Sequence, residues 1–421
     1  MRKIHIILIS LIILLGFGCE DKYTEIFTAN SPIYMSYESL AASIQQSEAR
    51  DLVNPGKMYF KDQLIFIVED RIGIHIIDNE DKSNPINLSF IEVPGVVDIA
   101  IKGVILYSDS YVDFVALDIS DIDNIIEVKR LEKVFPYTLP AYSNDLPMAH
   151  IDEEKGVVIA WEVKTVKQDQ QQYYYPIYAE SSFMDLANST MRPQVSGSGF
   201  GVGGSMARFG LYDDYLYTVD DSQMHIFDVS NPIDPSKLND FYAGWSIETM
   251  FINNDKMFLG TQNGMRIYDL ATAFSPSYIG EFRHVTSCDP VVVQDTLAFV
   301  TLRGGNNCGS NVNELDILSI SDITEAKLLK RYTMSAPYGL GIDDNTLFVC
   351  DGDAGLKIFD ISNPLTIDDN QIAHYQNIVA YDVIPLNGVL LLIGEDGFYQ
   401  FDYTDLEDIK LLSTIHVGVL E

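Results

Sequence analysis

Cysteines, basic residues and long apolar runs are all scarce in this sequence. Only 4 of the 421 residues are cysteine, which excludes a small domain held together mainly by disulfides. Lysine and arginine together number 27 against 61 aspartates and glutamates, and the net charge of -34 argues against binding of nucleic acid or of anionic lipid through a basic patch. The longest apolar run, residues 4–17, is shorter than the roughly 20 residues that a membrane-spanning helix needs.

Apolar residues nevertheless make up 47% of the chain and aromatic residues 11%. A disordered chain has few residues of either kind, because it buries too little surface to offset the entropy of folding. The composition therefore predicts a folded protein with a large core.

The first 19 residues have the pattern of an export signal. Arg2 and Lys3 precede the apolar run, and small residues precede Cys19. The ending resembles a bacterial lipobox, with Gly16 where that motif usually has leucine. We expect residues 1–18 to be a signal peptide, Cys19 to carry lipid, and residues 19–35 to form a lipidated tether. The alternative is an ordinary secretory signal in which Cys19 has no role.

A short phrase recurs along the chain: an apolar residue, any residue, Ile, a large apolar residue and Asp. Clear copies end at Asp78, Asp228, Asp269 and Asp360, and looser copies end at Asp118, Ser319 and Asp402. The usual spacing is about 41 residues, which indicates a repeat protein. We expect the Asp of each phrase to accept backbone N–H bonds in the turn that follows it.

Each repeat contains four strand-like runs separated by turn residues, which is the composition of a β-propeller blade. The sequence therefore predicts an all-β chain with a single β-propeller over residues 36–421, interrupted by an insertion at 164–205. We expect eight four-stranded blades; seven is the alternative, if the unit at 147–200 is not a blade. One helix is expected, over Ser39–Leu52.

Several phrases carry a family resemblance. Residues 226–232 and 358–364 are similar to the LVIVD repeat, as are residues 54–59, 94–100 and 203–209. From about residue 35 onward the chain resembles LVIVD-repeat lipoproteins of Bacteroidetes. Acidic residues directly after Cys19 also resemble the surface-export signal of such lipoproteins. The resemblance implies an extracytoplasmic β-propeller and carries no established catalytic activity.

Three cysteines remain when Cys19 is assigned to lipid. Cys288 and Cys308 flank two predicted consecutive strands, and we expect a disulfide between them because an exported protein meets an oxidising environment. Cys350 ends a predicted central strand, so a buried thiol is expected there. The rival hypothesis is a metal site formed by His284, Cys288 and Cys308, which lacks a recognisable fourth ligand.

Other candidate motifs have structural explanations. The glycine-rich residues 197–204 precede a predicted strand, so they do not form a dinucleotide-binding loop. Residues 351–355 lack the further ligands of a calcium loop and predict a turn between strands. His75 and His225 occupy the same repeat position, which indicates an architectural role. We therefore expect no catalytic residues, no cofactor and no metal.

The insertion contains a tyrosine-rich segment, and its candidate interaction residues are Tyr173, Tyr174, Tyr175 and Tyr178. Tyrosine is favoured at recognition surfaces because its ring is rigid and its hydroxyl is polar. The alternative is a strand in which alternate rings are buried.

We expect a non-catalytic extracytoplasmic binding or scaffold module, anchored to the outer membrane through lipid alone, with the cell surface as an alternative location. Its partner would be a protein or a glycan, not nucleic acid. One alternative is a hydrolase or lyase that acts on extracellular glycans or peptides at the mouth of the propeller channel. Another is a structural component of an envelope complex.

Overall fold

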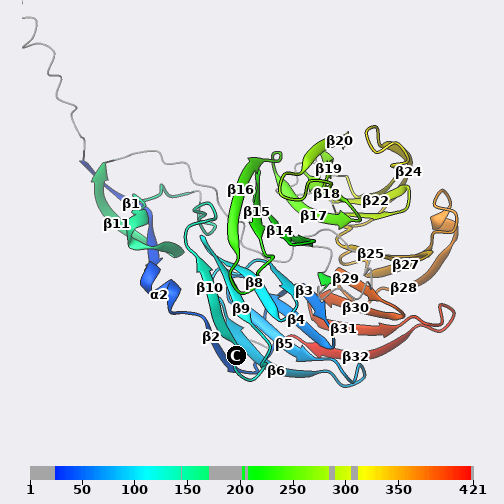
Figure 1. The fold of residues 1–421 in the computed structure, drawn as a ribbon, viewed down its shortest axis with the longest axis horizontal. Helices are drawn as coiled ribbons and strands as arrows, with labels where there is room; N and C mark the ends of the chain where they lie inside the picture. The colour runs from blue at the N-terminus through cyan, green and yellow to red at the C-terminus, as the bar shows by residue number, and fades with distance from the viewer. Residues whose placement is uncertain are drawn as a thin grey trace, which may run out of the picture. The chain divides into compact units, whose positions relative to one another are not determined.

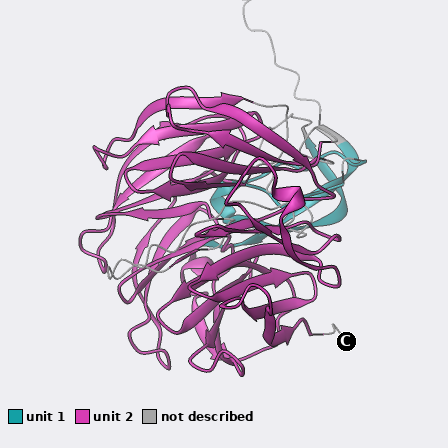
Figure 2. Cartoon of the chain, turned by 90° about the vertical axis from the view of Figure 1, so that its right-hand side faces the viewer, with its two compact units in different colours: residues 1–37, 138–178 teal, residues 38–137, 179–421 magenta. Residues whose placement is uncertain are grey.

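The computed structural model describes residues 24–143, 145–169, 202–203, 207–283, 290–304 and 312–418. The chain divides into two compact units, which Figure 2 colours separately. The smaller unit comprises residues 1–37 and 138–178, and the larger unit comprises residues 38–137 and 179–421.

The larger unit is a β-propeller of seven four-stranded antiparallel blades, each built from consecutive strands (Figure 1). Blade 1 contains β3 (Pro55–Lys61), β4 (Leu64–Glu69), β5 (Gly73–Asp78) and β6 (Ile86–Glu92). Blade 2 contains β7 (Ile99–Lys102), β8 (Ile105–Ser110), β9 (Asp113–Asp118) and β10 (Ile126–Leu131). Blade 3 contains β13 (Phe209–Tyr212), β14 (Tyr215–Val219), β15 (Gln223–Asp228) and β16 (Ser236–Tyr242).

The remaining blades follow the same order. Blade 4 contains β17 (Ile247–Asn253), β18 (Lys256–Thr261), β19 (Gly264–Asp269) and β20 (Ser277–Arg283). Blade 5 contains β21 (Val291–Gln294), β22 (Leu297–Leu302), β23 (Glu314–Ser319) and β24 (Lys327–Thr333). Blade 6 contains β25 (Leu340–Asp343), β26 (Thr346–Cys350), β27 (Leu356–Asp360) and β28 (Gln371–Tyr375), with a short 3₁₀ helix at Ile367–Asp369. Blade 7 contains β29 (Ala380–Leu386), β30 (Val389–Gly394), β31 (Gly397–Asp402) and β32 (Lys410–His416).

The all-β propeller is confirmed with seven blades, and the expectation of eight was wrong. The segment 147–200, expected to be the third blade, instead contributes β11 (Val157–Asp169) to the smaller unit. There β11 pairs antiparallel with β1 (Thr24–Met35), which falls within the segment expected to be a tether. The chain leaves the propeller at Thr138, earlier than the expected insertion start. Local strand signals do not reveal a partner so distant in sequence.

The expected helix over Ser39–Leu52 was also largely wrong. Helix α2 spans only Tyr37–Ala41, and β2 (Gln45–Glu48) then pairs with β6 at the outer edge of blade 1. The Gln46 side chain donates to Ser89 Oγ at 2.9 Å and accepts from Ile125 N at 3.0 Å. These tertiary bonds outweigh the weak helical preference of the segment.

First strands of neighbouring blades pack against one another, for example β13 with β7 and β17, so they lie innermost. Second strands are buried on both faces because adjacent blades cover them. Third strands also pack between blades: Phe114 of β9 and Phe227 of β15 stack across blades 2 and 3 with ring centroids 4.4 Å apart. The outer strands are largely exposed.

The first and second strands of each blade are joined by a tight turn that begins with a residue at positive φ, and in blade 7 Gly388 follows at +94°. The residues that begin these turns are Asp62, Gly103, Asp213, Asn254, Asp295, Asp344 and Asn387. Asp, Asn and Gly tolerate this backbone conformation best, which explains why one of the three occurs in every blade.

The Asp of the repeated phrase caps the turn between the third and fourth strands, as expected. Its Oδ1 accepts the backbone N–H two residues later at 2.7–2.9 Å in six blades: Asp78, Asp118, Asp228, Asp269, Asp360 and Asp402. Hydrogen bonds from the side chains of Ser120, Ser230 and Ser362, together with these backbone bonds, lower the pKa of Asp118, Asp228 and Asp360.

The smaller unit has the β1–β11 pair and a 3₁₀ helix at Glu153–Lys155. In the part of the chain that the structure describes, no helix has the length and apolar character needed to span a membrane.

Candidate functional site

We call the end of the propeller that carries the turns between second and third strands the loop face. In three blades an acid at the end of the second strand binds a base on the third strand of the same blade. The pairs are Glu69 with His75 at 3.2 Å, Asp220 with His225 at 3.0 Å, and Asp351 with Lys357 at 2.5 Å. All three bases lie three residues before the Asp of the repeated phrase. The architectural role expected for His75 and His225 is therefore confirmed.

Glu69 illustrates how partners within the chain occupy the carboxylate of such an acid. It is 1% exposed, and it also binds Arg50 Nη2 at 2.7 Å and Val53 N at 2.6 Å. Burial raises the pKa of Glu69, but the hydrogen bonds and the positive charges outweigh burial and lower it to about 2. A carboxylate bound in this way holds the loop face together and does not reach a ligand.

Asp351 is the first residue of the segment 351–355, which carries part of the pattern of a calcium loop. Its carboxylate accepts Ser335 N at 2.9 Å and Ala336 N at 2.8 Å, and its own N–H donates to Gly355 O. The segment is thus a turn between β26 and β27, as expected. Among the residues that the structure describes, no group of His, Cys, Asp and Glu is arranged to hold a metal ion.

A buried charged cluster lies near the channel at blades 1 and 2. Lys57 Nζ is 3.3 Å from Asp98 Oδ2, and Asp98 also accepts Phe209 N at 3.0 Å. The neighbouring Asp109 Oδ1 accepts Val97 N at 2.9 Å and Asp98 N at 3.0 Å. Burial and the charge of Asp98 raise the pKa of Asp109 to about 6, although these backbone bonds and Lys57 oppose the shift. Burial lowers the pKa of Lys57.

The channel side of blade 1 is covered by the chain itself. Strand β12 (Val202–Gly203) pairs with Tyr59 and Phe60 of β3 on the edge of β3 that β4 leaves free. A Cβ at position 203 would lie 3.1 Å from the Tyr59 ring, so glycine allows this close approach without a shift of that ring. The inner edge of β3 is therefore occupied.

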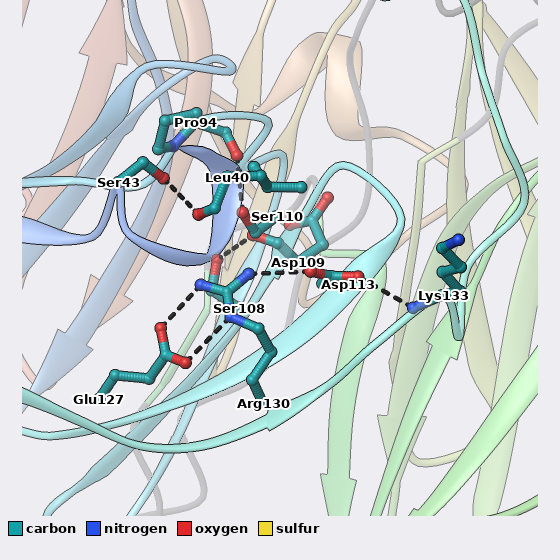
Figure 3. Close-up of polar contacts among 10 residues, drawn as sticks. All are labelled: Leu40, Ser43, Pro94, Ser108, Asp109, Ser110, Asp113, Glu127, Arg130 and Lys133. Atoms are coloured by element: carbon teal, nitrogen blue, oxygen red, sulfur yellow. Dashed lines mark hydrogen bonds and ion pairs between the residues drawn. The ribbon is translucent and has the colours of Figure 1, made fainter. Parts of the chain in front are cut away.

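The charged residues of blade 2 in Figure 3 are also bound internally. Arg130 binds Glu127 through Nε at 2.9 Å and Nη2 at 2.7 Å, and binds Asp113 Oδ2 through Nη1 at 3.0 Å (Figure 3). Asp113 Oδ1 accepts Lys133 N at 2.9 Å. This network ties β9 to β10 and to the segment after it.

A pocket of about 390 Å³ opens on the loop face at blade 4, and we call it the blade-4 pocket. It is lined by Trp245, by Thr261, by residues 263–266 and by residues 281–283. Trp245 is 66% exposed, an unusual state for so large an aromatic side chain. The volume is in the range of small-ligand sites.

Most of the site residues expected from the sequence lie outside the described residues: Cys19, Cys288, Cys308, Tyr173, Tyr174, Tyr175 and Tyr178. Cys350 is a free buried thiol, as expected. The described residues contain no disulfide.

Sequence reasoning missed the buried cluster and the blade-4 pocket. The cluster had a signal, because Lys57 and Asp98 both lie five residues before the positive-φ turn residue of their blades, a position that strand burial should make apolar. The sequence signal for the pocket was weaker: a tryptophan in the short link between β16 and β17.

These features define a seven-bladed β-propeller in which three blades hold an internal acid–base pair at the loop face. Within that class, the LVIVD repeat model matches residues 203–239 and 340–366, so the chain carries LVIVD repeats. No curated protein matches the chain.

Solved structures resemble the chain at low identity. Sqt1 of Saccharomyces cerevisiae has 7% identity and a TM-score of 0.49, covering 93% of this chain and 91% of its own. Hsv2 of Kluyveromyces lactis has 9% identity and a TM-score of 0.47, covering 83% of this chain and 94% of its own. A Lactobacillus plantarum protein has 11% identity and a TM-score of 0.42, covering 84% of this chain and 82% of its own. Such likenesses carry no functional argument.

Proposed function

We propose that the chain is a non-catalytic binding or scaffold module that acts outside the cytoplasm, anchored to the outer membrane through lipid on Cys19. Its ligand is a protein or a glycan. The observation that carries the proposal is a contrast at the loop face: Glu69, Asp220 and Asp351 bind partners within the chain. Trp245, in contrast, is exposed to solvent and lines a pocket.

Binding is favoured over hydrolysis for a physical reason. A glycoside hydrolase needs two carboxyl groups that face the substrate across one cleft. The lining of the blade-4 pocket includes a single carboxylate, Glu281, which pairs with Arg283. Asp98 and Asp109 accept backbone N–H groups and lie beside Lys57, which supports a structural role for them.

Affinity capture tests the binding proposal. The full chain, immobilised, is incubated with detergent-solubilised envelope, and retained material is analysed for proteins and glycans. Trp245→Ala should lose the retained ligand. Phe274→Ala is the matched control, because Phe274 is 56% exposed on the same blade, in the turn between β19 and β20 at the other end. Turnover of the retained ligand by the chain would contradict the non-catalytic proposal.

The anchor has its own test. The chain should incorporate radiolabelled palmitate and partition into the detergent phase, and Cys19→Ala should abolish both. Labelling that persists in Cys19→Ala would contradict lipidation at this residue, while the binding proposal would stand.

A further inference from the structure

We infer that the blade-4 pocket binds an acidic saccharide, with a sugar ring stacked on Trp245 and a sugar carboxylate paired with Arg266. This inference rests on the proposed binding function and names its ligand class. A glycan was one of two ligand classes left open above, and the pocket itself distinguishes them.

Four segments build the pocket. Trp245 comes from the link between β16 and β17, Thr261 and Asn263 lie at the turn between β18 and β19, Arg266 lies on β19, and Glu281 lies on β20. Thr261 Oγ1 donates to Gly264 O at 2.7 Å and closes this turn. Gly264 has a φ of +145°, and a Cβ there would lie 2.0 Å from Phe282 O, so the turn fits against β20 only with glycine. The walls are thus set by the backbone and do not need a ligand to form.

The aromatic wall is the Trp245 ring, which Tyr242 contacts although Tyr242 does not itself line the pocket. The Tyr242 and Trp245 rings meet edge to face with centroids 6.0 Å apart, and Tyr242 is itself 53% exposed. An exposed aromatic face attracts a partner with a flat apolar surface. One face of a pyranose ring, lined by C–H groups, is such a surface, and its edges carry hydroxyl groups that need polar partners.

Arg266 supplies a positive charge held in one position. Its Nη1 donates to Ala243 O at 3.0 Å, and Tyr268 OH donates to the same oxygen at 2.9 Å. Gly244 has a φ of +155°, and a Cβ there would lie 3.3 Å from the guanidinium, so glycine lets the Arg266 side chain lie close along the backbone. A preorganised guanidinium loses little entropy when it binds a carboxylate.

The local charge is opposite to that of the whole chain. Arg283 and Glu281 pair with each other, whereas Arg266 forms no ion pair among the described residues. The pocket therefore carries a net positive charge on a chain of net charge -34. A neutral sugar would not use this charge, and an acidic sugar would.

A saccharide is favoured over an acidic peptide by the rest of the lining. Asn263 and Glu281 add polar groups to the lining, which suits a ligand with hydroxyl groups on its edges. A carboxylate in the lining would repel a peptide made of several acidic residues, whereas it accepts hydrogen bonds from sugar hydroxyls.

Tryptophan fluorescence gives a direct test, because the chain has only two tryptophans. Trp161→Phe leaves Trp245 as the single reporter. This variant of the full chain is titrated with a galacturonate oligomer and with the same oligomer after its carboxylates are reduced to alcohols. We expect saturable quenching by the acidic oligomer and binding at least about tenfold weaker for the reduced one, a difference of about 1.4 kcal/mol.

Two substitutions and one competitor complete the test. Arg266→Gln should weaken binding of the acidic oligomer at least about tenfold, while Phe274→Ala should leave it unchanged. Calorimetry on the unsubstituted chain must give the same affinity, which guards against damage by Trp161→Phe. Equal affinity for both oligomers, or tighter binding of a hexaglutamate peptide, overturns the inference.

Failure of the ligand class can be told apart from failure of the proposed function. A protein retained by affinity capture and lost in Trp245→Ala overturns the saccharide and keeps the binding module. An acidic glycan lost in the same way supports both.

Discussion

The side-chain amide of Gln400 in blade 7 donates to Asn79 Oδ1 in blade 1 at 2.7 Å, across 321 positions of sequence. Both residues are buried, and Gln400 Nε2 also lies 3.2 Å from Lys82 O and 3.1 Å from Ser413 Oγ. No strand is exchanged between the first and last blades, because each is built from consecutive strands. Polar side chains therefore help to close the ring.

Asn79 is the polar exception at a repeat position that is apolar or aromatic in the other six blades, and the closure of the ring explains it. The residue after the repeated phrase donates its backbone N–H to the turn between the first and second strands in every blade, for example Val229 to Asp214 O at 2.8 Å. It is apolar or aromatic in the other blades: Ile119, Val229, Leu270, Ile320, Ile361 and Tyr403. Only at the ring junction does this position carry an amide.

Gln400→Ala should reduce the free energy of unfolding by about 2–3 kcal/mol, because it leaves the buried Asn79 carbonyl without its donor. Urea denaturation followed by circular dichroism measures the change. Gln376→Ala is the control, since Gln376 is an exposed glutamine on blade 6, and it should change stability by less than about 0.5 kcal/mol. Equal effects of the two substitutions would show that the junction is not sealed by this bond.

Asn254→Val should destabilise the chain by about 1–2 kcal/mol, because valine resists the left-handed backbone that Asn254 adopts at φ +54°. Asn254→Gly should leave stability nearly unchanged. Since Asn254 is exposed, lost packing does not confuse the comparison. Melting temperatures of the two variants measure the difference, and a valine variant as stable as the glycine variant would refute the turn argument.

The Cys350 thiol should not react with iodoacetamide in the folded chain at pH 8. Burial, with the charges of Asp382 and Asp351 nearby, raises the pKa of this thiol, so little of the reactive thiolate forms. Peptide mapping by mass spectrometry separates Cys350 from the other cysteines. Modification of Cys350 should appear in urea and be absent without it; rapid modification in the native chain would contradict its burial.

Loss of the proton from the Asp109 carboxyl should lower the free energy of unfolding as pH rises. Its pKa is raised to about 6 when folded, so between roughly pH 4 and pH 6 the folded chain holds a proton that the unfolded chain has released. The stabilising contribution is complete below about pH 4 and disappears as pH rises through 6. Asp109→Asn keeps the acceptor oxygen and lacks this titration, so the parent chain should lose stability relative to the variant from pH 4 to pH 7.

Urea midpoints across this pH range measure the Asp109 effect. Asp402→Asn is a control of opposite sign, because hydrogen bonds from Thr404 lower the pKa of Asp402, and the parent chain should gain stability relative to that variant as pH rises from about 2 to 4. A flat difference between the parent chain and Asp109→Asn would contradict the raised pKa.

The propeller was predictable because its signals are local and repeated. The phrase ending at Asp228 or Asp360 marks one strand and one turn, and its spacing gives the blade. The number of blades was not settled, because β11 reads as a blade strand on its own and its pairing with β1 depends on residues far away in sequence. Strand propensity reports the kind of element and not its partner.

The blade-4 pocket was not predictable for a related reason. Trp245, Arg266 and Glu281 come from three separate elements, and only the folded blade brings them to one cavity. The repeat position of His225 predicted an architectural role for it, but only the structure identified Asp220 as its acid partner.

Hydrogen–deuterium exchange with the ligand recovered by affinity capture tests most directly whether binding takes place at the blade-4 pocket. The account predicts slower exchange in residues 261–266 and 277–283 when the ligand is present, lost in Trp245→Ala and kept in Phe274→Ala. Slower exchange confined to residues 97–109 beside the channel, or to the tyrosine-rich residues 173–178, with blade 4 unchanged, would contradict it.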